Sequence, residues 1–380
     1  MQRKGLATDI YESACWHFPM NTCALLMLPV FAVSLGCSDG KTDRPPINHV
    51  AFSPDGKWLV GAGGTVKPNG GEGIAKVWET STWKLHDTWG EGFTDRVEQV
   101  HFASNEMVAT WSNEMEHNPR GGSPQRGIML RRWNIPEKKE LPKLHLSELR
   151  TWAGSTAYYP AGNLVASSSK DADKIGAIFT VPKLEETVTL KEDQARGASF
   201  RGFSPDGKRI LVAIGSAESP EVRVFDTSNG QRLAAHKLDA SNSKVNPTHV
   251  RSAEFSPNGK MIVIGTINPI KIYVLTADLS ATLLTLELGL FPDCLKFTPD
   301  NEMVAIKNGR NSIEMYSIKT KEAVKTFDGN PEGANGWCFS PDGAWIAIGS
   351  GGHPDDKGKT SPGKVRVFEV KTGKLVAELE

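Results

Sequence analysis

The residue types that carry out catalysis or bind metals are thinly spread along the 380 residues. No serine, threonine or cysteine has a partner base at a spacing that indicates an activated nucleophile. The acidic pairs Asp171/Asp173 and Asp355/Asp356 lack the spacing of an EF-hand loop, which favours solvated acidic loops. Two glycine-rich segments, residues 61–64 and 349–352, follow apolar runs and open loops instead of helices, which argues against phosphate binding. We therefore expect no catalytic residue, no metal and no cofactor.

A repeated motif, an aromatic residue followed by Ser/Thr-Pro-Asp-Gly, organises most of the chain. Phe52-Ser-Pro-Asp-Gly56 is one complete copy, and weaker copies fill the gaps. The mean spacing of the aromatic residues is about 48 residues. These aromatic positions are Phe52, Phe102, Tyr158, Phe203, Phe255, Phe297 and Phe339. The sequence thus contains seven units between residues 47 and 380.

Each unit predicts four strands. An alternating strand leads into the aromatic residue, and Pro and Gly then favour a tight turn. An apolar run follows, such as residues 210–214, which suits a strand buried on both faces. A third strand ends in an aromatic residue before a polar one, and a polar turn leads to a short outer strand. We expect an all-β fold, a seven-bladed β-propeller of four-stranded antiparallel blades.

The third-strand endings Trp78-Glu79, Trp133-Asn134, Phe225-Asp226 and Phe368-Glu369 resemble the Trp-Asp dipeptide of WD40 repeats. The resemblance covers about 330 residues and implies a β-propeller fold. No unit has a literal Trp-Asp pair or the Gly-His pair that opens a standard repeat. Bacterial exported propellers rich in the Ser-Pro-Asp-Gly turn are the closer likeness.

The N-terminal region predicts a leader. Residues 24–35 form an almost wholly apolar run, which is too short to span a bilayer as a helix but fits the apolar region of a signal peptide. The run ends at Gly36-Cys37, which resembles a bacterial lipoprotein signal and implies lipidation of Cys37 with cleavage before it. We expect a signal peptide over 1–36, a short tether over 37–46 and the propeller over 47–380. Translation could start at Met1 or at Met20, and an uncleaved anchor helix or a buried apolar segment is the alternative.

The net charge argues against nucleic acid as a partner. The 44 basic residues balance the 44 acidic ones, so the chain lacks the positive excess used in nucleic-acid binding.

After removal of the leader and lipidation of Cys37, two cysteines, Cys294 and Cys338, are left. We interpret them as small core residues; export would also permit a disulfide.

Three loops between second and third strands are long, namely residues 61–73, 112–127 and 349–363. They belong to blades 1, 2 and 7, which are neighbours in a closed ring, so they predict one raised rim. Long irregular loops are often functional, although insertions without a ligand are also well tolerated. Their mixed charges suit a protein or peptide partner. The candidate interaction residues are Trp111, Glu116, His117, Arg120, Arg126, His353, Asp355, Asp356 and Lys357.

The sequence therefore favours a non-catalytic protein-interaction platform, anchored by Cys37 to a bacterial membrane outside the cytoplasm. The alternative is a propeller enzyme, such as a metal-dependent hydrolase or lactonase, with its site at the mouth of the central channel. Four side chains near the starts of inner strands could approach that channel: His49, His101, His249 and Arg251. Nine scattered histidines are more typical of isolated core or surface positions.

Overall fold

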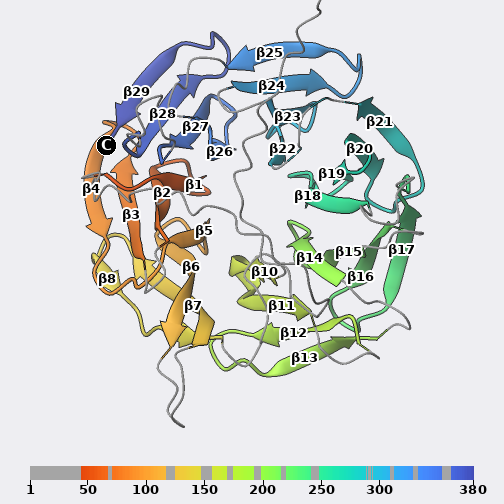
Figure 1. Cartoon of the computed structure of the whole chain (residues 1–380), viewed down its shortest axis with the longest axis horizontal. Helices are drawn as coiled ribbons and strands as arrows, with labels where there is room; N and C mark the ends of the chain where they lie inside the picture. The colour runs from red at the N-terminus through yellow and green to blue at the C-terminus, as the bar shows by residue number, and fades with distance from the viewer. Residues whose placement is uncertain are drawn as a thin grey trace, which may run out of the picture. The chain divides into compact units, whose positions relative to one another are not determined.

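A computed structural model of the chain divides into two units, Met1–Asp39 and Gly40–Glu380. It describes residues 44–66, 71–116, 125–146, 156–168, 174–191, 198–214, 220–240, 248–287, 289, 292, 294–308, 312–327, 333–352 and 361–380. These residues belong to the second unit and form seven antiparallel sheets arranged around a common axis (Figure 1). The predicted all-β propeller is confirmed.

The first three blades follow one another along the chain. Blade 1 contains β1 (Ile47–Phe52), β2 (Trp58–Thr65), β3 (Glu72–Glu79) and β4 (Lys84–Trp89). Blade 2 contains β5 (Val97–Phe102), β6 (Met107–Glu116), β7 (Gln125–Asn134), β8 (Lys139–Glu140) and β9 (Leu144–His145). Blade 3 contains β10 (Thr156–Tyr159), the short 3-10 helix η3 (Pro160–Gly162), β11 (Leu164–Ser168), β12 (Gly176–Thr180) and β13 (Glu186–Leu190). Blade 2 departs from the expected four strands because β8 and β9 each pair with β7 in place of one outer strand.

The other four blades have four strands each. Blade 4 contains β14 (Ala198–Phe203), β15 (Arg209–Ile214), β16 (Glu221–Asp226) and β17 (Arg232–Lys237). Blade 5 contains β18 (His249–Phe255), β19 (Met261–Ile267), β20 (Lys271–Thr276) and β21 (Thr282–Glu287). Blade 6 contains β22 (Leu295–Phe297), β23 (Met303–Asn308), β24 (Ser312–Ser317) and β25 (Ala323–Phe327). Blade 7 contains β26 (Gly336–Phe339), β27 (Trp345–Ser350), β28 (Lys364–Glu369) and β29 (Leu375–Leu379).

The Ser-Pro-Asp-Gly segments form the turns between first and second strands. In blade 1 the buried Ser53 hydroxyl donates to Asp55 Oδ1 at 2.7 Å and accepts the N–H of Trp58 at 2.9 Å. Gly56 has φ of +72°, a left-handed conformation in which glycine avoids the steric cost of a Cβ. Blades 4, 5, 6 and 7 repeat this hydrogen-bond pattern. We call the side of the propeller that carries these turns the turn face, and the opposite side the loop face.

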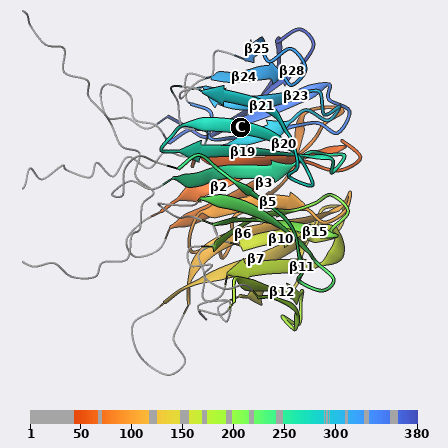
Figure 2. The same ribbon diagram turned by 90° about the vertical axis from the view of Figure 1, so that its right-hand side faces the viewer.

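Neighbouring turns also contact each other across blade boundaries. The Arg209 guanidinium in blade 4 donates to the carbonyl of Gly259 in blade 5 at 2.7 Å. The Asn301 side-chain oxygen in blade 6 accepts the N–H of Asn258 in blade 5 at 2.9 Å. The repeated motif therefore closes each inner hairpin and also joins blades. Figure 2 shows strands of several blades running side by side between the two faces.

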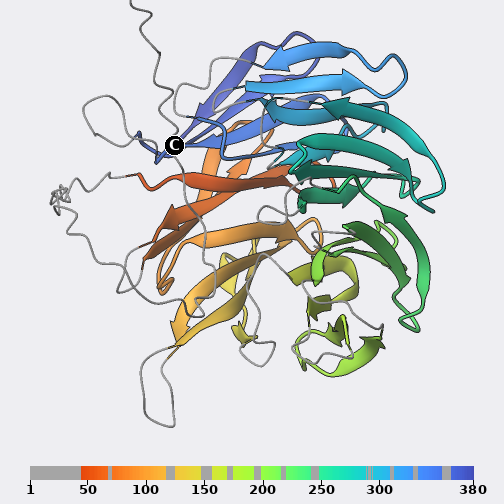
Figure 3. The same cartoon turned by 45° about the vertical axis from the view of Figure 1, so that its right-hand side comes forward.

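The core lies between adjacent sheets. Each of seven buried hydrophobic clusters combines side chains from two neighbouring blades. The cluster that joins blade 7 to blade 1 includes Ile47, Trp78 and Val367. This packing closes the ring without a strand shared between the ends, and β1 contacts both β26 and β27. In Figure 3 the red and orange strands of blade 1 lie beside the blue strands of blade 7. A single isolated sheet would leave both of its faces exposed to water, so burial of its apolar side chains requires the neighbouring blades of the ring.

Candidate functional site

The predicted rim lies at a sector of the loop face where blades 7, 1 and 2 are neighbours. The strands that flank each predicted long loop end at this face, but the loops are shorter than expected. Residues 66–71 join β2 to β3, residues 117–124 join β6 to β7, and residues 351–363 join β27 to β28. The observed loops are shorter because backbone pairing continues beyond the apolar part of each strand. The backbone N–H and C=O groups of polar residues form the same hydrogen bonds between strands.

The hairpin of β6 and β7 accounts for most of this difference. Each strand has ten residues, and the pairing runs from Met107 with Asn134 to Glu116 with Gln125. The predicted loop 112–127 is thus mainly strand. Glu116 and Arg126 lie on the distal part of this hairpin, where the structure gives their backbone pairing only.

The prediction that Trp111 belongs to the rim is wrong, because its side chain is only 2% exposed. Its ring contacts Tyr158 of blade 3 edge-on, with ring centroids 5.3 Å apart. Leu130 and Val165 belong to the same buried cluster. Trp111 therefore packs blade 2 against blade 3 and is unavailable to a partner.

The other predicted site residues lie outside the described part of the chain. These are Cys37, His117, Arg120, His353, Asp355, Asp356 and Lys357. Cys294 and Cys338 are described and form no disulfide. Both are partly buried and pack against core clusters, in agreement with their interpretation as small core residues.

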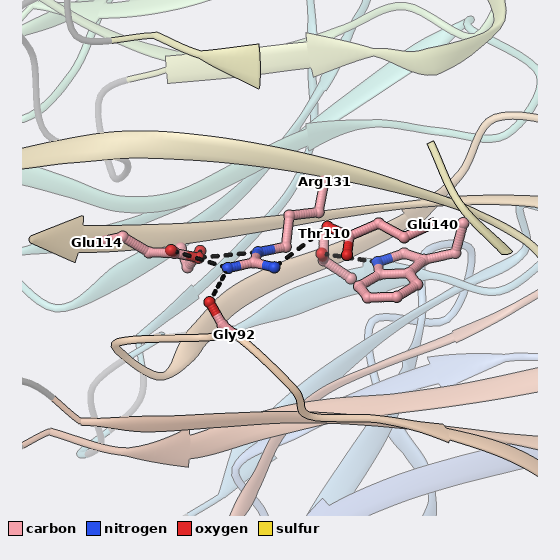
Figure 4. A network of polar contacts seen from close by, with 7 residues as sticks. Gly92, Thr110, Glu114, Arg131 and Glu140 are labelled. Carbon is pink, nitrogen blue, oxygen red and sulfur yellow. Dashed lines mark hydrogen bonds and ion pairs between the residues drawn. The ribbon is translucent and has the colours of Figure 1, made fainter. Parts of the chain in front are cut away.

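A buried ion-pair network braces the β6–β7 hairpin (Figure 4). Arg131 is 0% exposed and Glu114 is 4% exposed. Arg131 Nε donates to Glu114 Oε1 at 3.0 Å, and Nη2 donates to Oε2 at 2.9 Å. Arg131 Nη1 donates to Glu140 Oε1 at 3.1 Å, which attaches the short strand β8 to the same cation. Such planar, bidentate pairs are among the strongest hydrogen-bonded contacts in proteins.

The network also joins the hairpin to the segment that enters blade 2. Arg131 Nη2 donates to the carbonyl of Gly92, and the guanidinium lies over the Phe93 ring, 4.3 Å from its centroid. The Ser112 hydroxyl donates to Glu114 Oε1 at 2.7 Å. Most polar atoms of the buried pair thus have partners, which offsets the cost of removing two charges from water. This ion pair was not predicted from the sequence. The feature that could have indicated it is a charged residue, Arg131, within the otherwise buried run of β7.

The segment just before β1 forms a second structural feature of this sector. The carbonyl of Pro46 accepts the N–H of Gly64 in blade 1 at 2.9 Å. The carbonyl of Arg44 accepts the N–H of Gly363 next to blade 7 at 3.0 Å, and the Arg44 side chain pairs with Glu380. The last residues of the predicted tether are therefore part of the seam between blades 7 and 1.

Inner strands bring several charged side chains together around the axis. Lys296 Nζ lies 3.4 Å from Glu254 Oε2, and this carboxylate raises the pKa of Lys296. Burial, assisted by the positive charge of Lys296, lowers the pKa of His101 to about 4. His49 is exposed, yet desolvation by the surrounding inner strands lowers its pKa, as do the charges of His101, Lys296 and Arg96. Both histidines are therefore neutral at pH 7.

Among the described residues, no group of three or more His, Cys, Asp and Glu side chains is placed to hold a metal ion. Cations such as Lys296 oppose a second positive charge near His49 and His101. Within the same part of the chain, no helix has the length and apolar character needed to cross a membrane.

Comparison with protein families supports the class that the fold defines. A family model described as WD domain, G-beta repeat matches residues 34–79 and 321–357. These segments include β1 to β3 of blade 1 and strands of blades 6 and 7. Comparison with curated proteins finds no match. The chain is thus a seven-bladed β-propeller that is similar to WD40 repeats over these two segments. WD40 propellers commonly act as protein-interaction scaffolds.

Proposed function

We propose that the protein is a non-catalytic platform for a protein or peptide partner, held at a bacterial membrane outside the cytoplasm. The partner binds at the loop-face sector of blades 7, 1 and 2. The observation that carries the proposal is the β6–β7 hairpin, whose ten-residue strands are fixed by the Arg131–Glu114 pair. A rigid support beneath a binding segment lowers the conformational entropy lost when a partner binds.

The tether supports the same placement. Pro46 and Arg44 join both blades at the 7–1 seam, so a lipid on Cys37 would attach the propeller beside this sector. The seven residue-to-residue steps from Cys37 to Arg44 span at most about 25 Å when fully extended, which keeps the seam close to the membrane surface. A membrane-associated partner is the class that this geometry favours.

The lipid anchor is tested by metabolic labelling with a radioactive or clickable fatty acid. We expect label in the wild-type chain and none in Cys37→Ser, which should move from the membrane fraction to the soluble fraction. Label retained by Cys37→Ser would overturn the anchor. The propeller's partner binding is tested separately, as follows.

The interaction face is tested by replacing residues 117–124 with Asn-Gly. A two-residue turn of this kind closes an antiparallel hairpin directly after the Glu116–Gln125 pair and leaves the Arg131–Glu114 pair in place. Crosslinking in native membranes should then lose specific partners. The matched control shortens residues 215–220, which join β15 to β16 in blade 4. Identical partner sets in wild type and both variants would refute the proposed face.

A further inference from the structure

The outer strands of blades 6, 7 and 1 expose large apolar side chains to water. These strands, β25, β29 and β4, follow one another on the outer circumference of the ring (Figure 1). Each begins at the turn face, and within its first two residues it has a large apolar side chain that is between 42% and 57% exposed. These side chains are Val324, Leu375, Val376 and Leu85. Exposed apolar groups on consecutive blades indicate a surface that contacts a partner or a membrane.

Five exposed lysines lie beside these apolar side chains. Lys374 and Lys84 directly precede Leu375 and Leu85, and the other three lie in the turns before β25 and β29. We call residues 79–85, 319–324 and 369–376 the outer patch. Its five lysines exceed its three glutamates by two charges, and none of these lysines forms an ion pair among the described residues. The charged residues are Lys84, Lys319, Lys321, Lys371, Lys374, Glu79, Glu322 and Glu369.

The corresponding turns of blades 3, 4 and 5 lack this combination. They contain one lysine, Lys183, whose Nζ lies 3.8 Å from the carboxylate of Glu185. Leu233 of blade 4 is 53% exposed, but Arg232 is the single basic residue beside it. The coincidence of apolar and basic groups therefore belongs to one side of the ring.

The chain enters the ring on that same side. The carbonyl of Arg44 accepts the N–H of Gly363 just before β28, and the Arg44 side chain pairs with Glu380 just after the outer strand β29. The five residues of β29 span about 17 Å from the outer patch to this point. Since the tether from Cys37 reaches at most about 25 Å, a lipid on Cys37 and the outer patch can meet the same membrane surface.

The other charges of the turn face favour an edge-on orientation. The turns between first and second strands of blades 1, 6 and 7 carry the carboxylates of Asp55, Asp300 and Asp342. Neighbouring strands lie about 4.8 Å apart, so these turns are about 10 Å closer to the axis than the outer patch. The Debye length at physiological salt is about 8 Å, so an anionic surface at the circumference is attracted by the lysines and little repelled by these aspartates.

We propose that the outer patch rests on the surface of a bilayer that contains anionic lipids, so that the propeller stands on its edge. The lysine ammonium groups contact the lipid headgroups, while Leu85, Leu375 and Val376 enter the boundary between headgroups and acyl chains. This orientation rests on the lipid anchor of the proposed function. It leaves the loop face open to a membrane-associated partner.

Sedimentation with lipid vesicles tests the outer patch without the anchor. The chain used begins at Ser38, so it lacks the lipid and the leader but keeps every strand, since all strands lie within Gly40–Glu380. We expect binding to vesicles of equal parts phosphatidylglycerol and phosphatidylcholine, and much weaker binding to pure phosphatidylcholine. Added salt should weaken the binding, because it screens the lysines.

Paired variants separate the outer patch from a diffuse charge effect. Each lysine near an anionic bilayer contributes roughly a fivefold factor in affinity, so Lys371→Gln with Lys374→Gln should weaken binding about tenfold or more. The matched control, Lys183→Gln with Lys208→Gln, removes two exposed lysines from blades 3 and 4 and should leave binding unchanged. Leu375→Gln should weaken binding, whereas Leu233→Gln should not, although the two leucines are 51% and 53% exposed. Circular dichroism verifies that each variant is folded.

The outcomes distinguish the outer patch from the anchor. Absence of binding to the anionic vesicles would overturn the outer patch, as would equal weakening by the two double-lysine variants or equal binding to pure phosphatidylcholine. These results would leave the labelling of Cys37 unaffected. Vesicle binding by the chain from Ser38, together with retained label in Cys37→Ser, would overturn the anchor and support the outer patch.

Discussion

Arg131 on β7 donates two parallel hydrogen bonds of 3.0 and 2.9 Å to Glu114 on β6, a diagonal contact between residues that are not paired in the strand register. Replacing Glu114 by Ala leaves the fully buried Arg131 with one carboxylate instead of two. Removal of one partner from a buried pair typically costs about 3–5 kcal/mol. Because Glu140 still contacts Arg131, we expect the lower part of this range in urea unfolding.

The control for this prediction is the exposed pair of Lys183 and Glu185 in blade 3, with Nζ 3.8 Å from the carboxylate. Glu185→Ala should change the free energy of unfolding by about 1 kcal/mol or less, since water screens exposed pairs. If the two alanine variants unfold at the same urea concentration, the Arg131–Glu114 pair does not brace the hairpin.

The repeat made the fold predictable because each aromatic residue and each Ser-Pro-Asp-Gly turn acts locally. The hydrogen bonds of Ser53 with Asp55 and Trp58 involve residues at most five positions apart. Trp111 was misplaced because its burial depends on the contact with Tyr158, 47 positions away in another blade. Nothing in the local sequence specifies that contact.

The axial site was only partly predictable for a related reason. The sequence placed His49, His101, His249 and Arg251 near inner-strand starts, but it did not single out Lys296, which pairs with Glu254 beside His101. This pair joins the inner strands of blades 6 and 5 across 42 positions of sequence, so it depends on how the blades pack.

Gly207 tests whether the repeated turn also packs neighbouring blades. Gly207 and Gly373 have nearly equal φ values of +70° and +72°. A Cβ on Gly207 would lie 2.3 Å from the Tyr159 ring of blade 3, whereas none of the atoms around Gly373 comes within 4 Å of its added Cβ. Gly373→Ala should cost about 1–2 kcal/mol through backbone strain alone. Gly207→Ala should cost about 1–3 kcal/mol more, because a packed contact is overfilled.

Denaturant unfolding of the two alanine variants gives this comparison directly. The added variant Tyr159→Ala should recover part of the loss in the Gly207→Ala background. Equal destabilisation by Gly207→Ala and Gly373→Ala would mean that the Tyr159 contact has no energetic role.

His101 makes stability depend on pH. Its pKa is lowered to about 4 by burial and then by Lys296, whereas an unfolded histidine titrates near 6.5. As the pH falls from 7 to 5, the unfolded state gains a proton that the folded state does not bind. The contribution of His101 to stability is therefore greatest above about pH 7 and is lost as the pH falls through 6.5 towards 4, by about 2 kcal/mol at pH 5.

Urea unfolding at pH 7 and pH 5 measures the contribution of His101. In His101→Gln this contribution should be absent, so the decrease should be smaller than in the wild type. His236→Gln, on the outer strand β17, should keep the wild-type decrease. A wild-type decrease that persists in full in His101→Gln would contradict the axial origin.

The segment before β1 contributes to closure of the ring, and truncation separates this role from that of a passive tether. Removing residues up to 40 retains every hydrogen bond that Arg44 and Pro46 make with blades 7 and 1. Removing residues up to 46 leaves the N–H groups of Gly64 and Gly363 without these acceptors and deletes the Arg44–Glu380 ion pair. Each buried donor that stays unpaired costs about 1–3 kcal/mol.

The chain starting at Ile47 should therefore unfold at a clearly lower urea concentration, whereas the chain starting at Lys41 should match the chain starting at Cys37. Equal stability of all three chains would show that the seam between blades 7 and 1 closes by the hydrophobic packing of Ile47, Trp78 and Val367 alone.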